Sequence, residues 1–303
     1  MADFQPVADV YLQSRLASLL AWQNTDGGWG YFPGKKSWLE PTAYAVLALQ
    51  GSASAEPALQ RACNLIQSLR LPDGSYRPGS SVEDGTWATA LAVTIASVRG
   101  TFDDSTRGSV DWLLGVHGLE GSIFLRAASL VHLFHIHVDV SHEGWPWRPG
   151  NSAWIEPTAH TLIALKKAAP LCNTSRLRRR VRDGEEMILT RRCSDGGWNY
   201  GTPSVFNYDL PSYGDTTGLA LLGLLGRDPK DLAGPMQAAR RLQTNTRSPF
   251  SSAWLAIALR NCGVDLAAPD DHGRRGTDVA LTALEALGHP SGNFRLLGRG
   301  VHS

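Results

Sequence analysis

Three carboxylates stand at comparable points of the chain, each just ahead of a short apolar run with helical spacing. Glu40 lies in the segment W-L-E-P-T-A, and Glu156 lies in its near-copy W-I-E-P-T-A. Asp215 lies in the segment Y-G-D-T-T-G. A carboxylic acid that burial keeps protonated can act as a general acid, because it holds a proton that a substrate can accept. The three positions are therefore candidate catalytic acids at helix starts.

Aromatic residues gather near the same helix starts, and tryptophan is frequent at 10 of 303 residues. Aromatic faces attract cations by roughly 1–2 kcal/mol each when the site is desolvated. His160 follows Glu156 by one helical turn, which is close enough for a hydrogen bond to that carboxyl group. An acid cluster with aromatic walls would suit chemistry that passes through a carbocation. The candidate substrate-binding aromatics are Trp38, Trp87, Trp154, Tyr208, Tyr213 and Trp254.

The same residues also have ordinary structural explanations. Acidic residues at helix starts commonly cap the helix or face its dipole, and this is the leading interpretation of Glu40. The near-identity of the two W-[LI]-E-P-T-A copies suggests a shared structural task, which speaks against Glu40 and Glu156 as unique catalysts. The tryptophans of the Gly-Trp turns, Trp29 and Trp198, are expected to staple neighbouring repeats. The tryptophans at helix starts either line a cavity or fill a core.

The elements that must position these residues form an internal repeat. A turn containing Gly-Trp precedes each acidic segment: D-G-G-W at 26–29, G-W-P-W at 144–147 and D-G-G-W at 195–198. Each acidic segment is then followed by a helical run that is apolar nearly all round. Such a helix must be surrounded by other helices.

Amphipathic helices alternate with the apolar ones and are expected over 7–23, 57–71 and 175–192. Apolar inner helices ringed by amphipathic outer helices satisfy both patterns. The sequence therefore predicts an all-α protein, a single (α/α)6 toroid barrel of about twelve helices, in one domain over residues 1–303. The stretch 118–142 breaks the alternation.

Charge and cysteine content exclude several classes of protein. There are 29 Lys and Arg against 28 Asp and Glu, a net charge of +1, which gives no global case for nucleic-acid binding. The arginine-rich run 176–182 fits a solvated outer helix face.

No apolar tract approaches the roughly 18–20 residues of a membrane span, and the sequence shows no signal peptide. The four cysteines form no C-x-x-C pair, so a reduced, cytoplasmic protein is expected, with peripheral membrane contact left open.

A histidine-rich tract is the one pattern that suggests a metal. Its members are His132, His135, His137 and His142. A spacing of three residues places His132 and His135 on one helical face, but no carboxylate pattern such as H-E-x-x-H accompanies them. No metal site is therefore expected.

The Gly-Trp segments W-Q-N-T-D-G-G-W at 22–29 and C-S-D-G-G-W at 193–198 resemble the repeats of squalene–hopene and oxidosqualene cyclases. Protein prenyltransferase β-subunits share the same barrel. The resemblance covers roughly residues 8 to 290. Those triterpene cyclases have two such barrels, whereas this chain has room for one, so it resembles a single-barrel class II terpene cyclase.

Class II cyclases carry an Asp-x-Asp-Asp-Thr-Ala motif at the start of an inner helix, and its central Asp is the acid. Alignment on Thr-Ala places that Asp on Glu40 and on Glu156. In the third segment it falls on Asp215, close to the Asp-x-Asp-Thr-Thr variant. The first Asp of the motif is absent from all three, because Trp38, Trp154 and Tyr213 stand there.

The resemblance implies protonation-initiated cyclisation of an isoprenoid in an apolar cavity, with Asp215 or Glu156 as the acid and His160 beside it. It implies no cofactor, and Mg²⁺ only if the substrate is a diphosphate. The charged end of such a substrate would meet Lys35, Lys36 and Arg148, which lie near the expected mouth of the barrel.

Two alternatives remain at this point. The missing first Asp favours a non-catalytic barrel that binds an isoprenoid or a partner protein. A protein prenyltransferase β-like subunit is the weaker alternative, because that family binds zinc through an Asp-x-Cys pair. No Asp stands two residues before any cysteine of this chain.

Overall fold

The computed structural model describes residues 7–119, 142–206, 208–267 and 276–292. Within those ranges the chain forms eleven α-helices, one short 3-10 helix and one small hairpin. In chain order the elements are α1 (Val7–Ala21), α2 (Leu39–Leu49), η1 (Ala53–Ala55), α3 (Glu56–Ser68), α4 (Ala88–Arg99), α5 (Asp104–Gly115), α7 (Ile155–Cys172), α8 (Ser175–Thr190), β1 (Ser204–Val205), β2 (Tyr208–Asp209), α9 (Gly214–Gly223), α10 (Pro229–Asn245), α11 (Pro249–Asn261) and α12 (Val279–Gly288).

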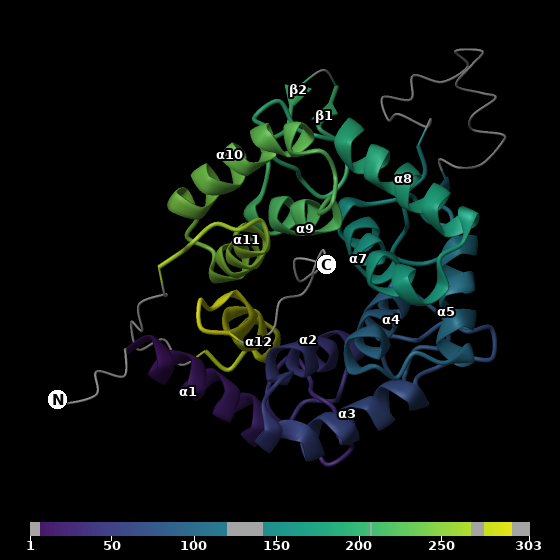
Figure 1. Cartoon of the computed structure of the whole chain (residues 1–303), viewed down its shortest axis with the longest axis vertical. Helices are drawn as coiled ribbons and strands as arrows, with labels where there is room; N and C mark the ends of the chain where they lie inside the picture. Colours follow the sequence, from purple (N-terminus) through teal and green to yellow (C-terminus); the bar gives the residue numbers. More distant parts are fainter. Residues whose placement is uncertain (1–6, 120–141, 207, 268–275, 293–303) are drawn as a thin grey trace.

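Six of these helices form a closed inner ring in the order α2, α4, α7, α9, α11 and α12, with α12 packed back against α2 (Figure 1). The helices α1, α3, α5, α8 and α10 lie outside this ring (Figure 1). The prediction of an all-α (α/α)6 toroid is thereby confirmed. The histidines at 132, 135 and 137, and most of the stretch 118–142, lie outside the described residues.

Composition explains which helices lie inside. Every residue of α9 is buried, because its run G-D-T-T-G-L-A-L-L-G presents apolar or small side chains on all faces. Outer helix α8 instead buries one side and exposes its other side, which includes Arg178 and Arg179. Gly218 lets α9 approach α11 closely, since a Cβ atom there would lie 2.7 Å from the backbone of Trp254.

The Gly-Trp turns act as staples between an outer helix and the next inner helix. The indole Nε1 of Trp29 donates to the carbonyl of Leu19 at 2.7 Å, and that of Trp198 donates to the carbonyl of Ile188 at 2.6 Å. Trp145 makes the equivalent bond to the end of α5. All three indoles are at most 1% exposed. The stapling role predicted for Trp29 and Trp198 is confirmed.

A threonine one turn into the inner helix completes each staple. The backbone N–H of Trp29 donates to the hydroxyl of Thr42 at 2.9 Å, and the backbone N–H groups of Trp145 and Trp198 make the same bond to Thr158 and Thr217. Tyr76 takes the tryptophan's place before α4 and donates to Thr89 at 2.9 Å. These hydrogen bonds fix the register of each inner helix against the turn that precedes it.

Candidate active site

The inner helices begin at one common end, and a chain of backbone hydrogen bonds links their starts. The N–H of Leu39 donates to the carbonyl of Pro78, and the N–H of Trp87 donates to the carbonyl of Trp147. The N–H of Ile155 donates to the carbonyl of Tyr200, which lies in the segment that precedes α9. These bonds bring the segments before α2, α4, α7 and α9 together around one mouth of the barrel.

The three candidate acids lie at this mouth. Glu40 and Glu156 are half-buried in the first turns of α2 and α7, and Asp215 is 9% exposed in the first turn of α9. Each precedes a staple threonine by two residues, so the three occupy equivalent positions of the repeat. The equivalent position on α4 holds Trp87, two residues before its own staple threonine. The sequence segments therefore do place their acids together.

Hydroxyl groups bind two of these acids. The Tyr31 hydroxyl donates to Glu40 Oε2 at 2.6 Å, and the Tyr200 hydroxyl donates to Asp215 Oδ2 at 2.8 Å. Ser251 Oγ of α11 donates to Asp215 Oδ1 at 3.4 Å. Hydrogen bonds of this kind favour the charged form of a carboxyl group.

Glu156 has the most perturbed carboxyl group of the mouth. Burial raises its pKa to about 8, and the negative charges of Glu40 and Asp215 add to this rise. Burial also raises the pKa of Glu40, although hydrogen bonds from Tyr31 and Tyr44 oppose the rise. At neutral pH the carboxyl group of Glu156 therefore carries its proton, as a general acid requires.

Three rings from alternate inner helices meet on the barrel axis beneath the acids. Tyr44 of α2, His160 of α7 and Trp254 of α11 have ring centroids 5.5 to 6.2 Å apart. All three rings are at most 4% exposed. Tyr44 and His160 follow Glu40 and Glu156 by four residues, so this layer, named here the ring floor, lies one helical turn below the carboxyl groups. The lumen is filled at that level.

Contacts within the ring floor are polar as well as aromatic. The hydroxyl of Tyr44 lies 3.2 Å from His160 Nε2. Burial lowers the pKa of His160 to about 3, so the imidazole is neutral. Trp87 extends the aromatic surface upward, with its ring 5.1 Å from His160 and 5.1 Å from Trp147.

Two expectations need correction. His160 was expected to hydrogen-bond Glu156, but its imidazole Nε2 lies 3.2 Å from the hydroxyl of Tyr44, because the ring packs between Tyr44 and Trp254 from other inner helices. Trp254 was expected at a helix start, but α11 begins at Pro249, so Trp254 lies deeper and belongs to the ring floor.

The remaining aromatic candidates lie at the edge of the mouth. Trp38 packs over Gly79 and Trp154 packs over Gly201, where an added Cβ atom would lie 3.0 Å from either indole. Tyr213 is 46% exposed with its ring 5.5 Å from that of Tyr200. Tyr208, on β2, is 77% exposed and directed to solvent. Of the six aromatic candidates, Trp87 and Trp254 therefore lie inside the barrel mouth. The other four lie at its edge.

The basic candidates are also peripheral. Lys35 and Lys36 are exposed in the segment before α2. Arg148 is exposed and forms an ion pair with Asp84 at 2.7 Å. None of these three is shown in contact with the carboxyl groups of the mouth.

Three tyrosines of the site were missed by sequence reasoning: Tyr31, Tyr44 and Tyr200. Only Tyr44 had a readable signal, because it follows Glu40 by four residues as His160 follows Glu156. Tyr31 and Tyr200 reach their acids from loops, whose course no helical period describes.

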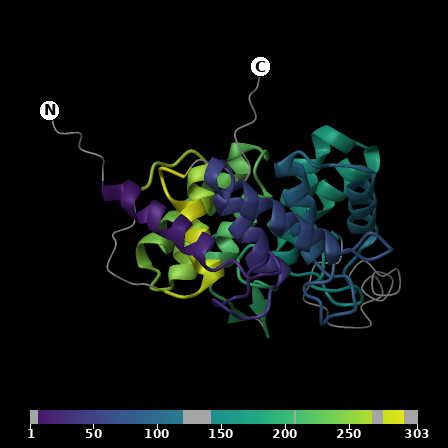
Figure 2. The ribbon, with the colours of Figure 1, turned by 90° about the horizontal axis from the view of Figure 1, so that it is seen from below.

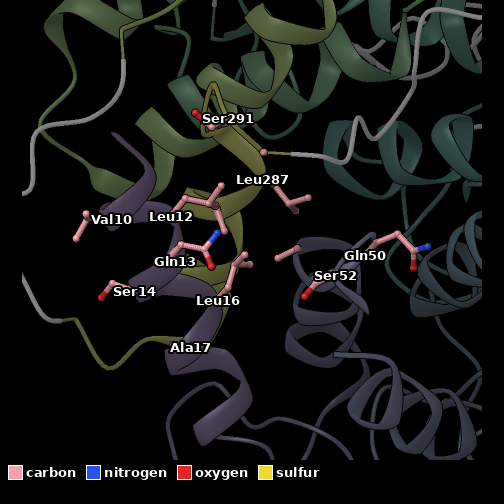
Figure 3. Close-up of a pocket in the computed structure, with 13 residues that line it drawn as sticks. Val10, Leu12, Gln13, Ser14, Leu16, Ala17, Gln50, Ser52, Leu287 and Ser291 are labelled. Atoms are coloured by element: carbon pink, nitrogen blue, oxygen red, sulfur yellow. The ribbon is translucent and has the colours of Figure 1, made fainter. Parts of the chain in front are cut away.

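A separate cavity of about 690 Å³ opens at the other end of the inner helices (Figure 3). It is lined by Leu12 and Leu16 of α1, by the end of α2 and by Leu287 of α12, with Gln13 and Gln50 among its polar groups. Among the described residues, no group of three or more His, Cys, Asp or Glu side chains is placed to hold a metal ion. Within the same ranges no helix has the length and apolar character needed to cross a membrane.

Comparison with solved structures defines the class of fold. A type II terpene cyclase variant, MstE from Scytonema, was solved in complex with geranylgeranyl dihydroxybenzoate. It matches this chain with a TM-score of 0.56 at 19% identity, over 93% of this chain and 77% of that chain. The endo-beta-1,4-glucanase CMCax from Acetobacter xylinum matches with a TM-score of 0.61 at 15% identity, over 93% and 97% of the two chains. The barrel is therefore shared by type II terpene cyclases and by glycosidases.

Similarity to curated protein sequences is confined to a short segment of the chain. The drimenyl diphosphate synthase of Streptantibioticus cattleyicolor is 47% identical over 55 residues, which is 18% of this chain and 10% of that synthase. The drimenyl diphosphate synthase of Streptomyces showdoensis is 45% identical over 64 residues, 20% of this chain and 12% of that synthase. The matched segments thus span about a tenth of the curated relatives. No protein-family model matches the chain. The chain thus has the fold of type II terpene cyclases and of glycosidases, and one segment of its sequence is similar to drimenyl diphosphate synthases.

Proposed function

We propose that this chain is a class II terpene cyclase-like isomerase that protonates an alkene or epoxide of an isoprenoid and cyclises it at the mouth of the barrel. The observation that carries the proposal is the position of Glu156 between two further carboxyl groups at the mouth, above an aromatic floor, where burial raises the pKa of its carboxyl group. The segment similarity to drimenyl diphosphate synthases supports an isoprenoid diphosphate as the substrate class.

Glu156 and Asp215 form the proposed acid pair. Glu156 holds the proton at neutral pH, and Asp215 occupies the position of the central Asp in the cyclase motif. In the reaction, the O–H bond of the carboxylic acid breaks as a C–H bond forms on the substrate alkene, which leaves a tertiary carbocation. Ring closure moves the positive charge along the chain. Loss of a proton from a carbon next to the final cation forms a C=C bond, and the proton returns through water to the Glu156 carboxylate, so that the acid is restored and substrate and product are isomers.

The ring floor and Trp87 would stabilise the cation. Their faces lie one turn below the acids, and each desolvated aromatic face contributes roughly 1–2 kcal/mol of attraction to a cation. His160 is a positioning residue in this scheme, because it is neutral and holds Tyr44 by a hydrogen bond. No step of this scheme requires a metal ion.

The test is incubation of the protein with farnesyl diphosphate, geranylgeranyl diphosphate and squalene, followed by mass spectrometry of the products. Glu156→Gln and Asp215→Asn should each lower turnover by at least about a hundredfold, since the first removes the proposed proton donor and the second removes its proposed partner carboxyl group. Glu40→Gln, at the equivalent position on α2, removes only a charge that helps to keep Glu156 protonated, so it should lower turnover less than either of these substitutions. Turnover that survives both substitutions would show that the acid pair is wrong.

The test also separates the non-catalytic alternative, which the absence of the motif's first Asp favours. A barrel that only binds an isoprenoid would retain the compound without forming a product. Any cyclised product formed by the wild-type protein and lost in Glu156→Gln would exclude that alternative.

A further inference from the structure

Large hydrophobic side chains are exposed mainly around the mouth of the barrel. Eight of the eleven exposed large hydrophobics among the described residues lie in the segments that lead into α2, α7 and α9. We name them the aromatic rim: Tyr31, Phe32, Trp154, Tyr200, Val205, Phe206, Tyr208 and Tyr213. Monomeric proteins rarely gather exposed apolar side chains in this way unless the surface binds something.

The hairpin of β1 and β2 is the most exposed part of the rim. Phe206 is 83% exposed and Tyr208 is 77% exposed. Phe206 has a φ of 50°, in the left-handed region that bulky residues rarely adopt. A glycine or asparagine would suit the backbone conformation of residue 206 better, so folding gives no reason for a phenylalanine at this position. Figure 2 shows the hairpin (green) extending beyond the helices at one end of the barrel.

The segment before α2 adds positive charge to the rim. Phe32 is 50% exposed, and Lys35 and Lys36 beside it are both exposed. No acidic residue occurs between Gly30 and Trp38. An exposed phenylalanine close to two exposed lysines is complementary to a lipid surface that carries negative charge.

The chemistry of the rim favours a membrane over a protein partner. Four of its eight side chains are tyrosines and one is a tryptophan, and these rings have an apolar body and a polar tip suited to the headgroup region. The side chains project from separate loops and a hairpin, whereas an amphipathic partner helix would need a continuous apolar groove.

We propose that the aromatic rim docks on the surface of an anionic lipid bilayer, with the β1–β2 hairpin and Phe32 inserted at headgroup depth and Lys35 and Lys36 against the lipid phosphates. In this orientation the mouth of the barrel faces the membrane. The proposal does not depend on catalysis, so an inactive acid variant should bind lipid as well as the wild-type protein does.

The experiment is co-sedimentation of the full chain with large unilamellar vesicles of phosphatidylcholine, with and without about 30% phosphatidylglycerol. We expect binding to the anionic vesicles and a blue shift of tryptophan emission, because Trp154 is 40% exposed in the free protein. Phe206→Ser combined with Tyr208→Ser should lower the partition coefficient at least tenfold. Lys35→Gln combined with Lys36→Gln should lower it by about 30-fold at low salt, because the attraction of two lysines is lost.

Two matched controls keep the test sharp. Val10→Ser and Leu171→Ser remove side chains that are 68% and 45% exposed outside the rim, and they should leave binding unchanged. Glu156→Gln, inactive under the proposed function, should also bind normally. The proposal would be overturned by absence of binding to both vesicle types, by binding that the rim variants do not weaken, or by a rim-dependent dimer in place of lipid binding.

Discussion

Glu156 ties the proposed acid to a measurable dependence of stability on pH. Burial and two neighbouring carboxyl groups raise its pKa from 4.5 to about 8. The folded state therefore binds this proton more tightly than the unfolded state between those two pH values. The stabilisation that this proton gives is fully present below pH 4.5 and is lost as pH rises through about 8.

The size of the effect follows from the shift. Each pKa unit corresponds to about 1.4 kcal/mol, so the loss between pH 5 and pH 9 has a ceiling of about 4 kcal/mol. Relaxation and water entry at the open mouth lower this ceiling, and we expect a loss of between about 2 and 4 kcal/mol. Glu156→Gln keeps the size of the side chain and removes its titration, so the variant should lack this part of the pH dependence.

The assay is urea denaturation of both proteins at pH 5, 7 and 9, compared as the change in unfolding free energy with pH. The wild-type protein should lose more stability than Glu156→Gln as pH rises. Glu83→Gln, at an exposed position, is the matched control for loss of a carboxyl group. Equal pH dependence of the wild-type protein and Glu156→Gln would refute the buried, protonated state of Glu156 and with it the basis of the proposed acid.

Further predictions concern the ring floor and the repeat. Burial lowers the pKa of His160 from 6.5 to about 3, so the wild-type protein should lose about 3 kcal/mol more than His160→Phe as pH falls from 7 to 4, measured by urea denaturation. Gly218→Ala should lower unfolding free energy by about 2–4 kcal/mol, because its Cβ atom would lie 2.7 Å from the backbone of α11. Trp198→Phe should cost about 2–3 kcal/mol through its lost indole hydrogen bond, whereas Trp154→Phe at the exposed rim should cost less than about 1 kcal/mol by thermal denaturation.

The repeat made most of the fold readable from the sequence. Each Gly-Trp turn is followed by an apolar helical run, because a staple needs an indole in a close turn and a threonine in the first turn of the helix that follows. Trp29 and Trp198 were therefore identified correctly as staples. The barrel follows from helices that are apolar on every face, which only a surrounding ring can bury.

Side-chain contacts between inner helices that are distant in the sequence could not be predicted from the repeat. The ring floor joins Tyr44, His160 and Trp254, which lie on three non-adjacent helices and are related by no local period. Sequence reasoning assigned His160 to the nearest carboxyl group along its own helix. The His160 ring instead contacts Tyr44 of α2 and Trp254 of α11, so its partners come from across the barrel and depend on how the ring of helices closes.

The structure also changes what the cyclase-like motif means. Thr217 accepts a hydrogen bond from the backbone of Trp198, and Thr216 donates to the carbonyl of the same residue at 2.6 Å. The threonines of the motif are thus requirements of the fold, and their match to the Asp-x-Asp-Thr-Thr variant does not by itself mark Asp215 as the acid.

The acids themselves are different, because the fold does not require them. Helix α4 has the same staple as α2, α7 and α9, yet Trp87 stands at the equivalent position and no acidic residue occurs in its first turn. The carboxyl group of Glu40 accepts a hydrogen bond from the Tyr31 hydroxyl, and it also lies in the first turn of α2, where it faces the positive end of the helix dipole. A position that an indole fills on α4 needs no carboxyl group for the staple to form. The proposed acid role therefore depends on what distinguishes Glu156 and Asp215 from Glu40, which the comparison of the Glu156→Gln, Asp215→Asn and Glu40→Gln variants measures.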